Sequence, residues 1–276
     1  MCIRAVIAIA AIVAAIPVSA AGDAVSRGGS LFLIHCAQCH GLTGKGDGSA
    51  AAFLPRKPRD FTQGIYKIKS SPPDIEIPRD EDLSGTISRG MSASGMPPWD
   101  KVLSEPERRD LVAYIKSLSD MFEGEANPPP LNMEGKAELT PESVARGREA
   151  YLRLKCDECH GPEGEGPSTK ALKDDYGAPI WPRDLTRPST YIGPFTREAL
   201  YARITNGIPL TPMPPHPRHG EPDTIAQDRW DAVNYVFALA EQAERRRTMY
   251  WAAGIALAFL GAGAWLIRAR RARKSP

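Results

Sequence analysis

Several kinds of residue and motif are scarce or missing in this sequence. Its 276 residues contain only five cysteines, and no motif for a molybdenum, flavin or copper site is visible. The formal net charge is only +2, whereas a nucleic-acid-binding protein would carry a basic face on its folded part. Chemistry on a small-molecule substrate would therefore belong to a partner protein, and nucleic acid is not an expected partner.

The small net charge hides an uneven distribution of charge along the chain. Residues 23–122 contain thirteen basic and thirteen acidic side chains, whereas residues 123–243 contain thirteen and nineteen. Residues 244–276 hold eight basic residues and one glutamate, and Arg4 adds one more positive charge. The acidic second part of the body would be steered towards a basic patch on a partner, and salt would weaken that attraction.

Four of the five cysteines belong to two copies of Cys-x-x-Cys-His, Cys36–His40 and Cys156–His160. This pattern is the attachment signature of c-type haem. Residues three and four apart share one face of a helix, so Cys36 and Cys39 can bond the vinyl groups while His40 binds iron. The same holds for Cys156, Cys159 and His160. A four-thiolate zinc site or a redox dithiol would not need the histidine, so we predict two covalently bound haem c groups.

The two motifs belong to a longer internal repeat. An Arg-Gly pair precedes each motif, a Gly-rich stretch follows it, and Pro-Arg-Asp and Met-Pro-Pro segments come later in both copies. The matched positions are Arg27–Gly28 with Arg146–Gly147, Phe32 with Tyr151, Pro58–Thr62 with Pro182–Thr186, Met96–Pro98 with Met213–Pro215, and Tyr114 with Tyr235. Each copy closes with an apolar-striped helix after a capping box, Ser104–Glu107 or Thr224–Gln227.

Each copy resembles a class I cytochrome c domain, in which an opening helix leads into the haem motif and a closing helix crosses it. The resemblance implies a mainly α fold of two tandem domains that transfers electrons and is not an enzyme. The expected domains span residues 22–122 and 141–243, with a Pro-rich linker over residues 123–140. The Pro-rich stretch 55–78 is longer than in a minimal domain and could cover a haem edge or form a docking surface.

The resemblance also implies the second axial ligand of each iron, because a Met-Pro pair carries it in class I cytochromes. Met96 and Met213 match this pattern, and both precede Pro-Pro. Met91 is an alternative to Met96, but it aligns with Ile208. A methionine ligand keeps the iron six-coordinate and raises its potential, whereas an open position permits substrate chemistry.

Other polar residues near the motifs have two interpretations each. His216 and His219 are alternatives to Met213, but both lie in a Pro-rich run, and we expect them to be solvated loop residues. His35, which precedes Cys36, is expected to be solvated too. Arg59 and Arg183 are candidate contacts of the haem propionates, because guanidinium binds carboxylate bidentately. The alternative is an ordinary surface pair of each arginine with the aspartate that follows it.

The two ends of the chain predict export and a membrane anchor. Residues 1–21 combine Arg4, an apolar run and small residues, which is typical of a signal peptide. Residues 248–267 lack charge and at about 1.5 Å per residue would span roughly 30 Å, enough for a bilayer core. The basic tail 268–276 would then be cytoplasmic. We therefore expect a C-terminal transmembrane helix in the inner membrane, with the haem domains in the periplasm.

Together these features predict a membrane-anchored dihaem cytochrome c that relays single electrons between redox proteins or respiratory complexes. One alternative is a permanent haem subunit of a larger membrane oxidoreductase complex. Another is a dihaem peroxidase, in which one iron would keep an open position for peroxide. The paired methionines disfavour the peroxidase, because they would fill both axial positions.

Overall fold

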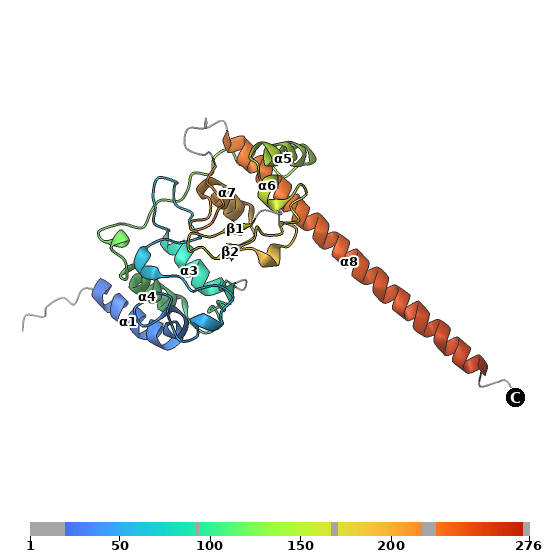
Figure 1. Ribbon diagram of the computed structural model, residues 1–276, viewed down its shortest axis with the longest axis horizontal. Helices are drawn as coiled ribbons and strands as arrows, with labels where there is room; N and C mark the ends of the chain where they lie inside the picture. Colours follow the sequence, from blue (N-terminus) through green and yellow to red (C-terminus); the bar gives the residue numbers. More distant parts are fainter. Residues whose placement is uncertain (1–19, 92–93, 167–170, 217–224, 273–276) are drawn as a thin grey trace, which may run out of the picture.

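The computed structural model describes residues 20–91, 94–166, 171–216 and 225–272, without the side chains of residues 20, 21, 225, 256 and 259–272. In this part the chain is mainly helical (Figure 1). The α-helices are α1 (Ala20–His35), α2 (Ala37–His40), α3 (Asp80–Arg89), α4 (Glu105–Lys116), α5 (Pro141–Arg153), α6 (Asp157–His160), α7 (Arg197–Asn206) and α8 (Ile225–Ala272). Strands β1 (Leu172–Lys173) and β2 (Pro179–Ile180) pair antiparallel. Short 3-10 helices cover Ala51–Phe53, Phe61–Gln63, Asp120–Phe122 and Pro188–Thr190.

The first half of the molecule is built on the crossing of α1 and α4 (Figure 1). Gly28 lies at the contact, where an added Cβ would be only 2.0 Å from the backbone oxygen of Asp110. The neighbouring Arg27 binds the Asp110 carboxylate through Nε at 2.6 Å and Nη2 at 2.8 Å. Phe32 packs against Tyr114, with ring centroids 5.1 Å apart. The crossing therefore requires glycine, and an ion pair and an aromatic pair flank it.

The second half repeats this crossing with α5 and the first turns of α8 (Figure 1). An added Cβ on Gly147 would lie 2.0 Å from the backbone oxygen of Asp231. Tyr151 packs edge-on against Tyr235 at 5.4 Å. The structure thus confirms the predicted fold of two tandem, mainly helical cytochrome c-like domains. The exact domain bounds stay a prediction.

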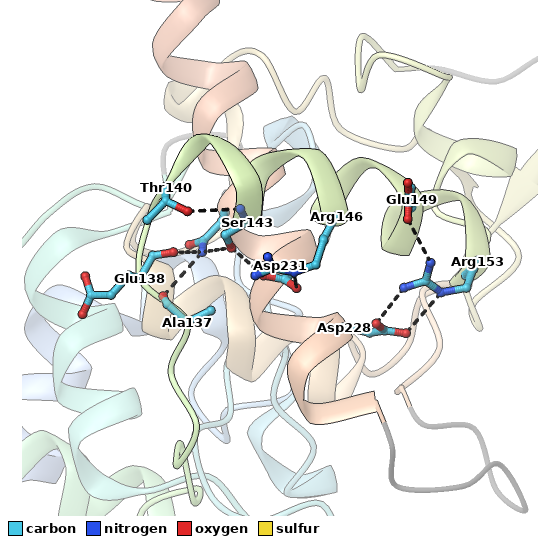
Figure 2. A network of polar contacts seen from close by, with 10 residues as sticks. Ala137, Glu138, Thr140, Ser143, Arg146, Glu149, Arg153, Asp228 and Asp231 are labelled. Atoms are coloured by element: carbon cyan, nitrogen blue, oxygen red, sulfur yellow. Dashed lines mark hydrogen bonds and ion pairs between the residues drawn. The ribbon is translucent and has the colours of Figure 1, made fainter.

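A buried polar network joins α5 to α8 (Figure 2). The Asp231 side chain is only 2% exposed, and it accepts hydrogen bonds from Ser143 Oγ and, at 2.8 Å, from Arg146 Nε. Asn234 Nδ2 donates to Ser143 Oγ at 2.7 Å. Burial alone would raise the pKa of Asp231, but the hydrogen bonds from Arg146 and Ser143 hold that pKa below its ordinary value. The carboxylate is therefore ionised, and it holds α5 and α8 together at their crossing.

The capping box expected at Ser104–Glu107 is confirmed, and the structure shows a second capped helix start at Thr140. Ser104 Oγ accepts from the Glu107 N–H at 3.5 Å, and Glu107 Oε2 accepts from the Ser104 N–H at 2.7 Å, which completes a capping box. Thr140 Oγ1 accepts from the Ser143 N–H at 3.2 Å, and Pro141 opens α5. These caps satisfy backbone N–H groups that have no partner within the helix.

The Pro-rich stretch 55–78 packs against the second half of the molecule. Asn206 Nδ2, on α7, donates to the backbone oxygens of Lys69 at 3.0 Å and Ser71 at 3.1 Å. The Tyr176 hydroxyl donates to Gln63 Oε1 at 2.9 Å. The stretch therefore contacts the second half of the chain, and the two roles that the sequence left open for it stay predictions.

The segment between the halves is tied to the first half. The Leu131 N–H donates to the Ser70 oxygen at 2.7 Å, and Arg79 Nε donates to the Pro128 oxygen at 3.2 Å. Leu131 is buried in the second core. The Pro-rich linker expected over residues 123–140 is thus an extended, anchored strip that contacts both halves.

The prediction of a transmembrane helix over residues 248–267 is wrong. These residues form part of α8, which begins in the core of the second half, where Trp230 and Val233 are fully buried. Within the part of the chain that the structure describes, no helix offers an apolar stretch sufficient to cross a membrane.

Four other predictions fall wholly or largely outside the described residues. The signal peptide over residues 1–21 precedes the described part except for the first residues of α1. Thr224, the start of the second capping box, and His219 lie in the gap between residues 216 and 225. The side chains of the basic tail 268–276 are likewise not described. These interpretations remain predictions.

The helix crossing gives a first testable prediction. Gly147→Ala should lower the free energy of unfolding by about 1–3 kcal/mol, because the new methyl group overlaps the Asp231 backbone oxygen and forces the helices apart. Gly254→Ala, in helix α8, is the control, because nothing lies within 4 Å of its added Cβ. Urea unfolding followed by circular dichroism measures both. Equal stability of the two variants would contradict the role of Gly147.

Candidate haem site

Both Cys-x-x-Cys-His motifs open into one cavity of about 400 Å³. Residues of both halves line this cavity, and its wall combines aromatic, aliphatic and basic side chains. The structure brings together all eight residues predicted for haem attachment and iron binding, which are Cys36, Cys39, His40, Met96, Cys156, Cys159, His160 and Met213. The two motifs therefore face a common interior space.

One helical turn presents each motif to the cavity. The His40 N–H donates to the Cys36 oxygen at 2.8 Å, so Cys36 and His40 lie on the same side of α2. Gly41 follows with φ of 80°, a conformation that favours glycine. The chain then turns back, and the Gly46 N–H donates to the His40 oxygen at 2.8 Å. The second motif repeats each step, with the Gly166 N–H bonded to the His160 oxygen at 2.8 Å.

The orientation of both histidines suits iron binding. His40 Nδ1 lies 3.1 Å from the backbone oxygen of Arg59, and His160 Nδ1 lies 2.9 Å from that of Arg183. A carbonyl oxygen only accepts, so Nδ1 carries the proton and Nε2 keeps its lone pair for a metal. Burial lowers the pKa of both imidazoles, which keeps them neutral at neutral pH. Phe61 stacks on the His40 ring at 4.5 Å.

The cysteines are unsuited to the zinc and dithiol alternatives. Burial raises the pKa of Cys36 to about 11 and that of Cys156 to about 12, whereas zinc sites and redox dithiols use the thiolate. Cys36, Cys39, Cys156 and Cys159 form no disulfide with one another. Among the described residues, no three His, Cys, Asp or Glu side chains are grouped to hold a metal ion. The thiols instead fit covalent attachment of a flat ligand in the cavity.

The two methionine loops have the same backbone geometry. The Met91 N–H donates to the Met96 oxygen at 2.9 Å, and the Ile208 N–H donates to the Met213 oxygen at 3.1 Å. Gly90 precedes the first loop with φ of 67°, and its added Cβ would lie 2.6 Å from the Met96 oxygen. The structural pairs agree with the sequence alignment of Met96 with Met213. Both Met91 and Met96 line the cavity, so the choice of axial ligand stays a prediction.

Two histidines are less solvated than the sequence suggests. His216 is only 7% exposed and lines the cavity. Its backbone oxygen accepts from Arg229 Nη1 at 2.8 Å, so the first turns of α8 cover it. His35 is partly buried and packs edge-on against Trp99 at 5.2 Å. The expectation of a solvated loop residue is therefore wrong for His216, whereas His35 is only partly shielded from solvent.

Arg59 and Arg183 contribute to the cavity in two ways. Their backbone oxygens hold the histidines, and their side chains line the cavity. Neither forms an ion pair with the aspartate that follows it, within the described residues. Asp60 and Asp184 instead accept from the backbone N–H groups two residues ahead, at 3.0 Å and 2.9 Å.

Sequence reasoning missed the carbonyl role of both arginines and two further basic residues, Arg56 and Lys67, which line the same cavity. The carbonyl groups of Arg59 and Arg183 both belong to the repeated Pro-Arg-Asp segment. The repetition of this segment was therefore the sequence signal that could have indicated their contact with the histidines. No comparable signal marked Arg56 and Lys67, because neither lies in a matched segment of the repeat. Their position depends on how the Pro-rich stretch meets the second half.

Comparison with known proteins gives relatives in respiratory complexes. Subunit CcoP of a cbb3-type cytochrome c oxidase from Helicobacter pylori is 26% identical over 150 residues, which is 52% of this chain and 40% of the relative. A cytochrome c subunit of a cytochrome bc1 complex from Corynebacterium efficiens is 32% identical over 98 residues, 35% of this chain and 26% of the relative. The match with these curated relatives thus spans two fifths of their length or less.

A solved structure is similar over most of the chain. One chain of the reducing HAO-like protein complex Kustc0457/Kustc0458 of Kuenenia stuttgartiensis is 35% identical, with a TM-score of 0.69. The match covers 77% of this chain and 95% of that one.

A protein-family model described as cytochrome C oxidase, cbb3-type, subunit III matches this chain twice. The two matches to this model cover residues 23–115 and 142–236, and each contains one Cys-x-x-Cys-His motif. They confirm the predicted cytochrome built from two tandem cytochrome c domains, a family that carries covalently bound haem c. Because the matches cover more than half of its residues, the chain belongs to the family of cytochrome c oxidase, cbb3-type, subunit III.

Proposed function

We propose that this chain is a dihaem c-type cytochrome that relays single electrons as a subunit of a respiratory oxidoreductase complex. The observation that carries the proposal is the common cavity into which both haem motifs open. Two redox groups in one interior space allow an electron to enter through one half and leave through the other. The subunit role is supported by the relatives, which are named as components of oxidase and bc1 complexes.

The residues of the proposed site have distinct tasks. Cysteines 36, 39, 156 and 159 attach the cofactor, while His40 and His160 bind iron with Met96 and Met213 opposite. Bound haem c supplies reversible one-electron chemistry at its iron. The backbone oxygens of Arg59 and Arg183 fix the imidazoles, and their side chains are offered to the propionates. The buried aromatic wall keeps water from the iron ligands.

The haem-binding halves are proposed to face the periplasm. In the bacterial families that this chain resembles, c-type haem is attached outside the cytoplasmic membrane. The N-terminal residues 1–21, with their apolar run and small residues, are typical of an export signal. Redox partners are therefore expected on that side of the membrane.

Haem loading gives the first test of the function. Mass spectrometry of the purified chain should show two covalently bound haems, because each motif offers two thiols and a neutral imidazole. Replacing both Cys156 and Cys159 by alanine should leave one haem, and the same change at Cys36 and Cys39 should leave the other. A wild-type chain with one haem or none would contradict the dihaem proposal.

The axial ligand of the first haem has a matched pair of variants. Met96→Leu should abolish the methionine–iron charge-transfer band of that haem and lower its potential, because a thioether ligand stabilises ferrous iron. Met91→Leu, which also changes a cavity-lining methionine, should keep both the band and the potential. Visible spectroscopy and redox titration measure these effects. The reverse pattern would assign Met91 as the ligand.

The proposed place in a complex is tested by mild detergent extraction of native membranes. We expect the chain to copurify in fixed stoichiometry with other oxidoreductase subunits through size-exclusion chromatography, as identified by mass spectrometry. A cytochrome that elutes alone, and that soluble donors freely reduce, would instead identify a mobile relay.

A further inference from the structure

Four basic side chains of the cavity wall meet where the two halves touch: Arg56, Arg59, Lys67 and Arg183. The first three belong to the first half and the fourth to the second. Arg56 reaches across the contact, and its Nη1 donates to the Pro179 oxygen at 3.4 Å. Ile68, next to Lys67, lies against Gly193, where an added Cβ would be 2.7 Å from Ile68 Cδ1. The segment that carries Lys67 is therefore seated on the second half.

These charges lie close enough to repel one another. The pKa of Lys67 is lowered first by burial and then by the positive charges of Arg59, Arg56 and Arg183. The pKa of Arg183 is lowered by burial and then by Arg56. The repulsion between Lys67 and Arg183 acts between the two halves of the molecule. Like charges gathered in a partly buried place are unfavourable unless an anion joins them.

The protein itself supplies few anions there. Among the described residues that line the cavity, six are Lys or Arg and one is a carboxylate, Glu158; the six are Arg56, Lys57, Arg59, Lys67, Lys155 and Arg183. Asp174 attracts Lys67 and Asp60 attracts Arg59. However, Asp174 accepts from the Tyr176 N–H at 3.1 Å, and Asp60 accepts from the Thr62 N–H at 3.0 Å. Both carboxylates thus already accept hydrogen bonds within their own loops. Basic side chains still outnumber carboxylates in the wall of the cavity.

We propose that Arg56, Lys67 and Arg183 form one anion site that binds carboxylate groups of both bound haems. Each haem carries two propionates, so a doubly loaded cavity gains the negative charge that its wall lacks. Guanidinium groups suit this task because they bind carboxylates bidentately. The inference rests on the proposed function, since it needs a haem in each motif. It adds a site that neither half forms alone.

A shared site makes the two haem potentials respond together. Reduction adds an electron, so a nearby positive charge favours the reduced form and raises the potential. A cation that contacts the propionates of both haems therefore acts on both irons. A cation that serves one haem acts strongly on that iron alone.

The test is a spectroelectrochemical titration of the purified, doubly loaded chain. Lys67→Gln should lower both midpoint potentials, shifting the oxidised-to-reduced ratio of each haem about tenfold at a fixed potential, or about 59 mV. Arg183→Gln, on the other half, should also lower both. Lys67→Arg should retain the wild-type values, because it keeps the charge. Arg109→Gln is the control, because Arg109 is exposed on α4 and pairs with Glu105.

Visible spectra and haem content, recorded for every variant, show whether loading and axial ligation are preserved. If Lys67→Gln and Arg183→Gln keep two low-spin haems but each lowers only one potential, or neither, the shared site is overturned. The proposed function would survive that result. A wild-type chain without two haems would overturn both proposals. Joint shifts in the two variants, absent from Arg109→Gln and Lys67→Arg, support the shared site.

Discussion

The close approach of two helix backbones at a single glycine is the constraint on which each half depends. Gly28 and Gly147 let an opening helix lie against the carbonyl of Asp110 or Asp231, where any side chain would collide. The same aspartates bind the arginines that precede the glycines. Each opening helix leads directly into its haem motif. The position of that crossing therefore fixes where the thiols and the imidazole enter the cavity.

Features of the site that repeat along the chain could be predicted from the sequence. The alignment of Met96 with Met213 reappears as matched backbone hydrogen bonds, and the Arg-Gly pairs reappear as matched crossings. Each of these features lies within one segment or between two segments of the same half. A duplicated sequence reveals them because each copy must satisfy the same steric and hydrogen-bonding requirements. The cysteine and histidine pattern is local in the same sense.

What the sequence did not predict depends on contacts between the copies or on coverage by distant segments. Within the stretch 55–78 only Pro58–Thr62 is matched to the second copy, so the repeat could not indicate that the stretch joins the halves. His216 lies in a Pro-rich run typical of a solvated loop, yet α8 covers it. Residues 248–267 read as a separate apolar segment, whereas they continue a helix rooted in the second core. In each case tertiary context overrides local composition.

The continuity of α8 has a mechanical consequence. Its 48 residues contain no proline, and at about 1.5 Å per residue such a helix is about 72 Å long. One end holds Asp231, which binds Arg146 on the helix leading to the second motif, while the other end projects away from both halves (Figure 1). Since α5 leads into Cys156 and packs against the first turns of α8, a contact made at the far end of α8 would act on the helix that positions the second haem motif.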